Sequence, residues 1–145
     1  MFQRHPIQND SMMFVTTNTE DKRKVFAHPA HAREAIDTLY RTQEQHPFLL
    51  YGFVIMPDHC HFLVKPISPV KISTIMRVYK YGVSTNIGVG PIWQSRFHLK
   101  IVEEVETVLH YIHANPVRAN LSGSPQEYPW SSASGKWEVS EWGCL

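Results

Sequence analysis

The chain lacks the features that mark secreted or membrane-spanning proteins. Its 145 residues include two cysteines, Cys60 and Cys144. That is too few for a disulfide framework and indicates a reducing cytoplasm. No run of about eighteen apolar residues is present, which excludes a membrane-spanning helix. The first residues lead into no apolar signal core, so we expect no export signal. The net charge of +1 does not by itself demand a nucleic-acid partner.

What remains is the composition of an ordinary globular protein. Hydrophobic residues make up 43% of the chain and charged residues 19%, which is the usual range for soluble domains. The length suits one domain with its own core, and no repeat or interdomain linker is visible. We therefore expect a single domain over residues 1–145, with a core from about 12 to 119 and an irregular tail from 120 to 145.

Hydrophobic spacing predicts a regular order of strands and helices. Strands are predicted over Met12–Thr17, Phe48–Met56, His59–Lys65 and Phe97–Glu103, and helices over Pro29–Gln45, Val70–Val83 and Glu104–Asn115. Pro116 is expected to limit the last helix, because the residue before a proline avoids the helical region. This order is typical of the α/β (α+β) class and of a ferredoxin-like split βαβ fold. The fold would have a four-stranded antiparallel sheet with helices on one face and an added C-terminal helix free to approach the other.

The segment Met56–Val64 holds the most informative pattern, two histidines separated by one residue at the start of a predicted strand. Successive side chains of a strand point to opposite faces, so His59 and His61 share one face and Cys60 lies on the other. Two neighbouring imidazoles can hold one divalent metal ion. For an isolated pair, two histidines on a solvent-facing strand would be the simpler interpretation.

The last predicted helix carries a second pair of polar side chains. At about 100° per residue, Tyr111 and Asn115 lie together at one border of its apolar stripe. Each has a plain structural interpretation, Tyr111 as a half-buried core aromatic and Asn115 as a helix cap before Pro116. Together with the histidines, they are the parts of a metal-assisted phosphoryl-transfer site. In such a site a cation polarises the phosphodiester and a tyrosine attacks phosphorus.

Four segments, taken in order, resemble the motifs of one family of DNA-processing enzymes. Met56–Val64 resembles an HUH motif, and Tyr111–Ala119 resembles a Tyr-Ile-x-x-Asn-Pro-Val-Arg-Ala segment. Trp93–Phe97 matches a Trp-x-x-Arg-Phe element, and Tyr128–Ser132 matches a Tyr-Pro-Trp-Ser-Ser element. These are the motifs of the single-tyrosine (Y1) HUH transposases of bacterial insertion sequences, in their REP-associated branch. The resemblance extends from about Phe14 to Ser132.

The resemblance implies a metal-dependent transposase that cleaves and rejoins single-stranded DNA through a 5′-phosphotyrosine intermediate at palindromic, hairpin-forming sequences. Tyr111 takes the place of the family's nucleophile. His59, His61 and Asn115 take the places of the ligands of a Mg²⁺ or Mn²⁺ ion. The family acts as a homodimer, so we expect a homodimer that binds single-stranded or hairpin DNA, with no membrane association and no organic cofactor.

Basic and aromatic side chains supply candidates for DNA contact. Arginine and lysine bind backbone phosphates, and an exposed tryptophan can stack on an unpaired base. Trp93 fits core packing equally well, and any of the basic residues could be a solvated surface charge. The candidates are Arg77, Lys80, Trp93, Arg96, Lys100 and Arg118.

Two other interpretations stay open from the sequence. A protein of the same fold could bind hairpin DNA without catalysis, or the histidine pair could hold a metal ion that activates water in a hydrolase. Among competing tyrosines, Tyr79 lies on the apolar stripe of its helix and Tyr81 has no partner amide. A covalent protein–DNA adduct that depends on Tyr111 would separate the three interpretations.

Overall fold

The computed structural model describes residues 11–142, so Cys144 lies outside the described part of the chain. Its order of elements is the predicted one. The strands are β1 (Met13–Thr19), β2 (Phe48–Met56), β3 (His59–Pro66) and β4 (Trp93–Ile101), and the helices are α1 (Pro29–Gln45), α2 (Ile72–Ile87) and α3 (Val105–Arg118). Short 3₁₀ helices occupy residues 20–22, 25–27, 125–127 and 132–134. No helix within residues 11–142 is long and apolar enough to cross a bilayer.

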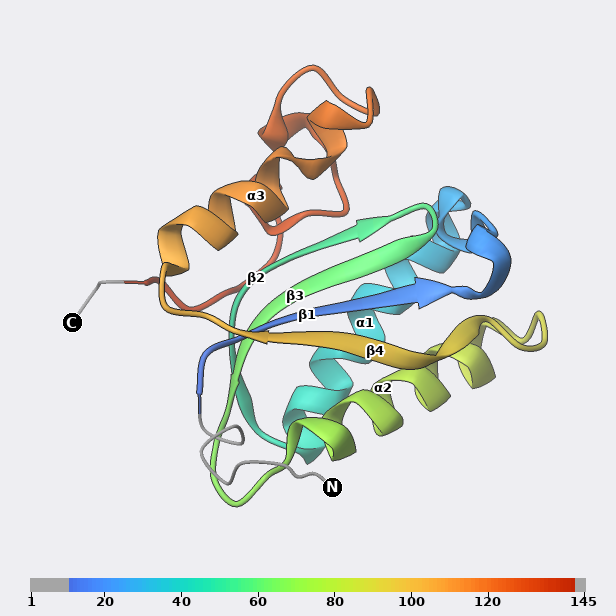
Figure 1. The fold of residues 1–145 in the computed structure, drawn as a ribbon. Helices are drawn as coiled ribbons and strands as arrows, with labels where there is room; N and C mark the ends of the chain where they lie inside the picture. Colours follow the sequence, from blue (N-terminus) through green and yellow to red (C-terminus); the bar gives the residue numbers. More distant parts are fainter. Residues whose placement is uncertain (1–10, 143–145) are drawn as a thin grey trace.

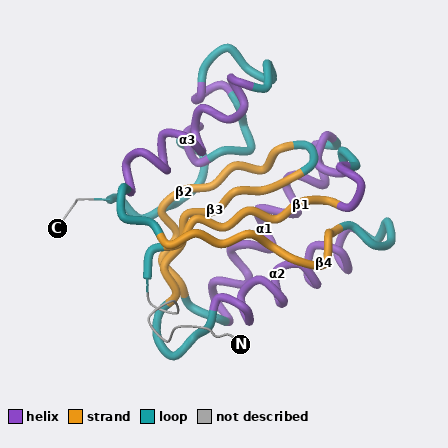
Figure 2. The backbone as a smooth tube through the Cα atoms, in the orientation of Figure 1, coloured by secondary structure: helices purple, strands orange, loops and turns teal. Residues whose placement is uncertain are grey.

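The four strands form one sheet in the order β2-β3-β1-β4, with every neighbouring pair antiparallel. Helices α1 and α2 pack on one face, and α3 lies across the opposite face, over β2 and β3 (Figure 1). The tube view in Figure 2 shows the same layers, with β4 at the edge of the sheet farthest from α3. The predicted ferredoxin-like α+β fold, with an added helix on the second face, is confirmed.

Alternation along β3 divides its side chains between two hydrophobic cores. Cys60 and Phe62 are buried in the core under α1 and α2, whereas Leu63 belongs to a smaller core with Ile112 of α3. Burial raises the pKa of the Cys60 thiol, so this side chain stays neutral and packs as a small hydrophobe. The histidines on either side of Cys60 consequently belong to the face that α3 covers.

The C-terminal end of α3 differs from the prediction. Pro116 does not end the helix at Asn115; it lies buried inside the last turn, and the helix continues to Arg118. The carbonyl oxygens of this turn find donors further along, since the amide of Ala119 bonds to Asn115 at 3.1 Å and the amide of Leu121 to Pro116 at 2.8 Å. These bonds and the burial of the proline ring hold the turn in helical form, and Arg118 therefore belongs to the helix of Tyr111.

Strand β4 also begins earlier than expected. It starts at Trp93 and not at Phe97, because Trp93 pairs with Thr19 beyond an irregularity in the register of β1. Where the register shifts, hydrophobic and polar residues no longer alternate strictly, so the alternation pattern does not reveal where the strand begins.

The segment that follows α3 covers the free edge of β2. The amide of Ile55 bonds to the carbonyl of Trp130 at 2.8 Å, and Val54 forms an isolated bridge with Ser131. The hydroxyl of Tyr128 donates to the carbonyl of Ile55 at 2.7 Å. The Tyr128–Ser132 segment is therefore a structural brace between the sheet edge and the region of α3.

Candidate active site

His59 and His61 lie side by side at the beginning of β3, on the face that α3 covers. Their ring centroids are 4.7 Å apart and the ring planes make an angle of 74°. Nδ1 of His61 lies 2.8 Å from Oγ1 of Thr16 on β1, and Nδ1 of His59 lies 2.6 Å from a carboxylate oxygen of Asp58. With both Nδ1 atoms engaged, the Nε2 atom of each ring remains available to bind a ligand. In metal-binding histidines, a hydrogen bond to one ring nitrogen commonly fixes the orientation of the ring and leaves the other nitrogen for the metal.

His61 is held in its neutral form by its surroundings. The residue is only 6% exposed. Burial lowers its pKa to about 3, and the neighbouring His59 and Arg118 act in the same direction. A neutral imidazole carries the lone pair that a metal ion needs. The site therefore keeps this histidine ready to bind a cation without first losing a proton.

Tyr111 reaches the histidines from α3 of the same chain. Its ring centroid lies 5.8 Å from that of His61 and 5.9 Å from that of Phe14, both in edge-on geometry. The guanidinium carbon of Arg118 lies 4.3 Å from the ring centroid. The ring therefore has neighbours on three sides, although 41% of the residue's surface is exposed.

The hydroxyl of Tyr111 is not used to hold the fold together. Within residues 11–142, no hydrogen-bond partner of this hydroxyl is found. By contrast, the hydroxyls of Tyr40, Tyr79 and Tyr128 donate to backbone carbonyls at 2.5 to 3.1 Å. Burial raises the pKa of Tyr40 to about 12 and also raises those of the other two. Tyr111 is thus available for chemistry in a way that these three structural tyrosines are not.

A cavity of about 470 Å³ lies between the β2–β3 hairpin and the C-terminal half of α3. His59, Tyr111 and Asn115 all line this cavity, and His61 contacts the Tyr111 ring edge-on. The structure thus gathers the four residues that the sequence singled out. The lining residues are Lys24, Met56, Pro57, Asp58, His59, Tyr111, Asn115, Arg118, Ala119 and Leu121.

Lys24 is the member of this cavity that sequence reasoning missed. It lies in the loop between β1 and α1 and lines the cavity. Two backbone hydrogen bonds connect this loop to the β2–β3 hairpin: the Phe26 amide donates to the Pro57 carbonyl at 2.9 Å, and the Thr19 amide donates to the Asp58 carbonyl at 3.0 Å. No local pattern marks this lysine. Only the contact between the loop and the hairpin places a second positive charge, beside that of Arg118, at the cavity.

The donor set at the cavity fits a divalent cation with open positions. In the described chain, no group of three or more His, Cys, Asp or Glu side chains could hold a metal ion. The donors near the cavity are the imidazoles of His59 and His61 and the side-chain amide of Asn115; a cation held by them would have positions left for solvent or phosphate oxygens. Mixed nitrogen and oxygen ligands suit Mn²⁺ well, and Mg²⁺ when oxygens dominate.

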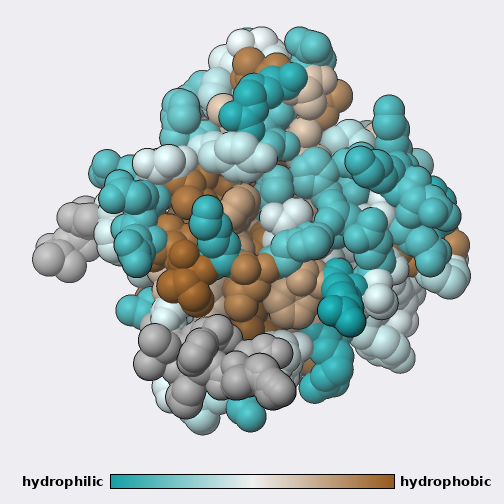
Figure 3. Space-filling view, in the orientation of Figure 1, coloured by the Kyte–Doolittle hydropathy of each residue, from teal (hydrophilic) through white to brown (hydrophobic). Residues whose placement is uncertain are grey.

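Three of the predicted DNA-contacting residues lie on the same side of the sheet as the histidines. Arg118 lines the cavity. Lys100 is opposite Phe14 in the register of β4 with β1, and the exposed Arg96 follows the same alternation. In Figure 3, hydrophilic side chains gather over the end of the molecule where the β2–β3 hairpin lies, and hydrophobic ones toward the opposite end of the strands. Arg118, Lys100 and Arg96 therefore place positive charges on the face of the sheet that carries the histidines.

The other three predicted contacts lie apart from the cavity. Arg77 and Lys80 are on α2, which covers the opposite face of the sheet. The Lys80 ammonium donates to the Gln94 carbonyl at 2.7 Å. Trp93 packs beside Phe26 at 5.4 Å between ring centroids, and its indole N–H donates to the Lys80 carbonyl at 3.1 Å. The packing of Trp93 corresponds to the structural alternative considered for it.

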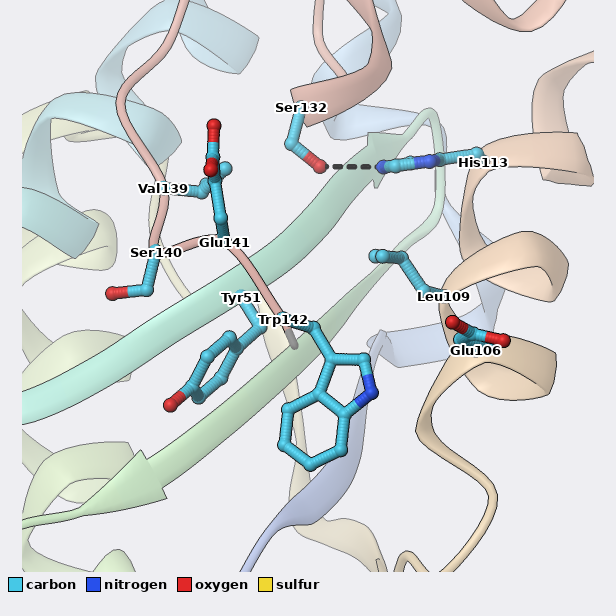
Figure 4. A pocket seen from close by; sticks show the side chains of 9 residues that line it. All are labelled: Tyr51, Glu106, Leu109, His113, Ser132, Val139, Ser140, Glu141 and Trp142. Carbon is cyan, nitrogen blue, oxygen red and sulfur yellow. Dashed lines mark hydrogen bonds between the residues drawn. The ribbon is translucent and has the colours of Figure 1, made fainter. Parts of the chain in front are cut away.

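A second hollow lies on the other side of α3, against β2 and the end of the described chain (Figure 4). Figure 4 shows the side chain of Ser132 turned toward His113, and their Oγ and Nε2 atoms are 2.8 Å apart. The same hydroxyl accepts a hydrogen bond from the Phe53 amide at 3.0 Å. Ser132 therefore links α3 to the edge of the sheet, and this hollow shares no lining residue with the histidine cavity.

Helix α3 approaches the sheet closely at one glycine. A Cβ atom at Gly52 of β2 would lie 2.3 Å from Cδ1 of Leu109 on α3, well inside van der Waals contact. A larger residue at this position would force the Leu109 side chain, and with it the packing of α3 on β2, to rearrange. The sequence shows Gly52 only as an interruption in an apolar strand.

Comparison with known proteins identifies the family. The sequence profile described as "Transposase IS200 like" matches residues 9–115, which include β1 and both histidines and end at Asn115. The chain belongs to this family. The transposase family inferred from the motifs is thus confirmed, and with it the assignment as a DNA transposase. No curated protein matches the chain.

Solved structures show the same fold for this IS200-like transposase. A REP-associated tyrosine transposase bound to a REP hairpin superimposes with a TM-score of 0.79 and 21% identity, over 100% of this chain and 92% of the other. A candidate transposase from Deinococcus radiodurans R1 superimposes with a TM-score of 0.59 and 15% identity, over 83% of this chain and 98% of the other. At these identities, the similarity establishes the fold.

Proposed function

We propose that this IS200-like transposase cleaves and rejoins single-stranded DNA with Tyr111 as its nucleophile. One observation carries the proposal: the Tyr111 ring lies 5.8 Å from His61, and its residue lines the same cavity as His59, with no hydrogen bond to its hydroxyl found among the described residues. A tyrosine that is half-exposed, without a structural partner and next to two metal-ready imidazoles has the position that phosphoryl transfer requires.

In the proposed reaction, the phenol oxygen of Tyr111 attacks the scissile phosphorus. The new O–P bond forms a 5′-phosphotyrosine, the bond to the 3′ oxygen breaks, and the phenolic proton passes through solvent to leave a 3′-hydroxyl. A later 3′-hydroxyl attacks the phosphotyrosine and restores the free phenol. His59, His61 and Asn115 would hold Mg²⁺ or Mn²⁺, which would polarise the phosphodiester and offset its negative charge.

The DNA substrate is proposed to be a hairpin with a single-stranded flank. The structural neighbour with a TM-score of 0.79 is bound to a hairpin. In this chain, Lys24 and Arg118 line the cavity, and Arg96 and Lys100 lie on the exposed edge strand of the same sheet. Such positive charges bind backbone phosphates and set affinity and register, not base choice.

A homodimer in the cytoplasm remains part of the proposal, but it is not needed to complete the site. Tyr111, His59 and His61 come together within one chain. We therefore propose that the tyrosine attacks DNA held by the histidines of its own subunit. A dimer that exchanges α3 between its subunits would first have to separate α3 from β2 and β3 of its own chain.

Replacement of Tyr111 by phenylalanine tests the function. Purified protein is incubated with hairpin DNA carrying a labelled single-stranded flank and Mg²⁺ or Mn²⁺, and covalent adducts are resolved on a denaturing gel. The unmutated protein should form an adduct that Tyr111→Phe abolishes, with hairpin affinity nearly unchanged. Tyr81→Phe is the matched control, because Tyr81 is 73% exposed on α2 and should be dispensable.

Other outcomes would favour the alternatives. Cleavage that persists in Tyr111→Phe without any adduct would indicate a hydrolase that activates water at the histidine pair. Hairpin binding with no adduct from the unmutated protein, at any divalent cation tested, would indicate a DNA-binding protein that has lost catalysis.

A further inference from the structure

We propose that Arg118 is a positioning residue, which holds the ring of Tyr111 in the orientation for attack and is more than a phosphate contact. This inference rests on the proposed function of Tyr111. It comes from one contact, the guanidinium carbon of Arg118 at 4.3 Å from the ring centroid of Tyr111. A planar guanidinium stacks on an aromatic face with both electrostatic and packing contributions.

The contact depends on the unexpected length of α3. Residues seven apart on an α-helix lie almost on the same side, about two turns apart. A helix that stopped at Asn115 would leave Arg118 in a loop. Because α3 continues through Pro116 to Arg118, the arginine side chain is on the face of Tyr111 and can reach back along the helix to its ring.

The other neighbours of the Tyr111 ring leave its orientation weakly defined. His61 and Phe14 contact it only in edge-on geometry, with ring-plane angles of 66° and 75°. Its hydroxyl has no hydrogen-bond partner among residues 11–142 that could fix it. A cation over the ring is therefore the contact best placed to restrict its rotation. Misplacement of a nucleophile by a fraction of a bond length lowers the rate strongly.

Lys24 provides the matched control for charge. It lines the same cavity and carries the same charge as Arg118, but no contact of its ammonium with the Tyr111 ring is found in the described residues. Loss of either side chain removes one positive charge from the cavity. Only loss of Arg118 also frees the ring.

The experiment compares Arg118→Ala, Arg118→Lys and Lys24→Ala in the full chain with hairpin DNA and Mn²⁺. Circular dichroism first confirms that each variant is folded. Hairpin affinity as a function of salt is then separated from the single-turnover rate of adduct formation at saturating DNA. Lys24→Ala should weaken affinity and reduce the salt slope by about 1, and its saturated rate should fall far less than that of Arg118→Ala. Arg118→Ala should lower the saturated rate by about tenfold or more.

Arg118→Lys keeps the charge without the planar stack, so it should restore affinity but not the rate. A spectroscopic signature tests the contact without DNA: the δ-protons of Arg118 should show an upfield ring-current shift in NMR spectra that Tyr111→Leu removes. Equal saturated rates for Arg118→Ala and Lys24→Ala would overturn the positioning role, while adduct formation by the unmutated protein would uphold the proposed function. Absence of any adduct from the unmutated protein would instead overturn the proposed function, and the positioning role with it.

Discussion

Lowering the pH from about 7 to about 5, with a chelator present, should destabilise this transposase through His61. In the folded chain, burial lowers the pKa of His61 to about 3. In the unfolded chain, a histidine has its ordinary pKa of about 6.5. Between these two values the unfolded state binds a proton that the folded state does not. The contribution of His61 to stability is therefore complete above about pH 6.5 and is lost as the pH falls toward 3.

The magnitude follows from the difference between the two pKa values. One pKa unit corresponds to about 1.4 kcal/mol, so the whole window corresponds to at most about 5 kcal/mol. Over the step from pH 7 to pH 5, the unfolded histidine becomes almost fully protonated, and the expected loss is about 2 kcal/mol. The 6% exposure of His61 leaves little solvent screening to reduce this figure.

The assay is urea unfolding followed by circular dichroism at several pH values in the presence of EDTA. His61→Asn is the comparison, because its amide can keep a hydrogen bond to Thr16 without titrating. The unmutated protein should lose about 2 kcal/mol more than this variant between pH 7 and pH 5. His113 has a lowered pKa through burial and the neighbouring His110, but it is present in both proteins and cancels. If the free energy of unfolding of the two proteins changed with pH in parallel, the claim that His61 is buried and neutral in the folded chain would be refuted.

Three further predictions follow from the packing around α3. Gly52→Ala should destabilise the fold by about 1–3 kcal/mol and reduce adduct formation, since its Cβ would meet Leu109 at 2.3 Å; urea unfolding and the adduct assay check this. Thr16→Val should leave the fold intact but weaken Mn²⁺ binding about 10- to 100-fold in calorimetry, because Nδ1 of His61 loses its partner. Ser132→Ala should cost about 1–3 kcal/mol in unfolding, since a strand amide of β2 loses its acceptor, and a smaller loss would mean that water replaces the hydroxyl.

Local periodicity determined much of the fold and the identity of the central residues. Strand alternation placed His59 and His61 on one face, and Cys60 is indeed in the opposite core. Helical spacing placed Tyr111 and Asn115 together, and both line one cavity. These features depend on residues within a few positions of one another, so the short-range geometry of the backbone determines them.

Long-range packing decided the rest of the site. Three features of the site join segments that are far apart in the chain. Helix α3 packs closely on β2 at Gly52, Lys24 reaches the cavity from the loop before α1, and Ser132 accepts a hydrogen bond from an amide of β2. Even the helical state of Arg118 depends on burial of Pro116, which outweighs the local preference to end the helix. The sequence by itself determined which chemical groups share a strand face or a helix face. Only the tertiary structure decided that the two faces meet within one chain, because that meeting depends on the summed contacts of many separate elements and not on any local pattern.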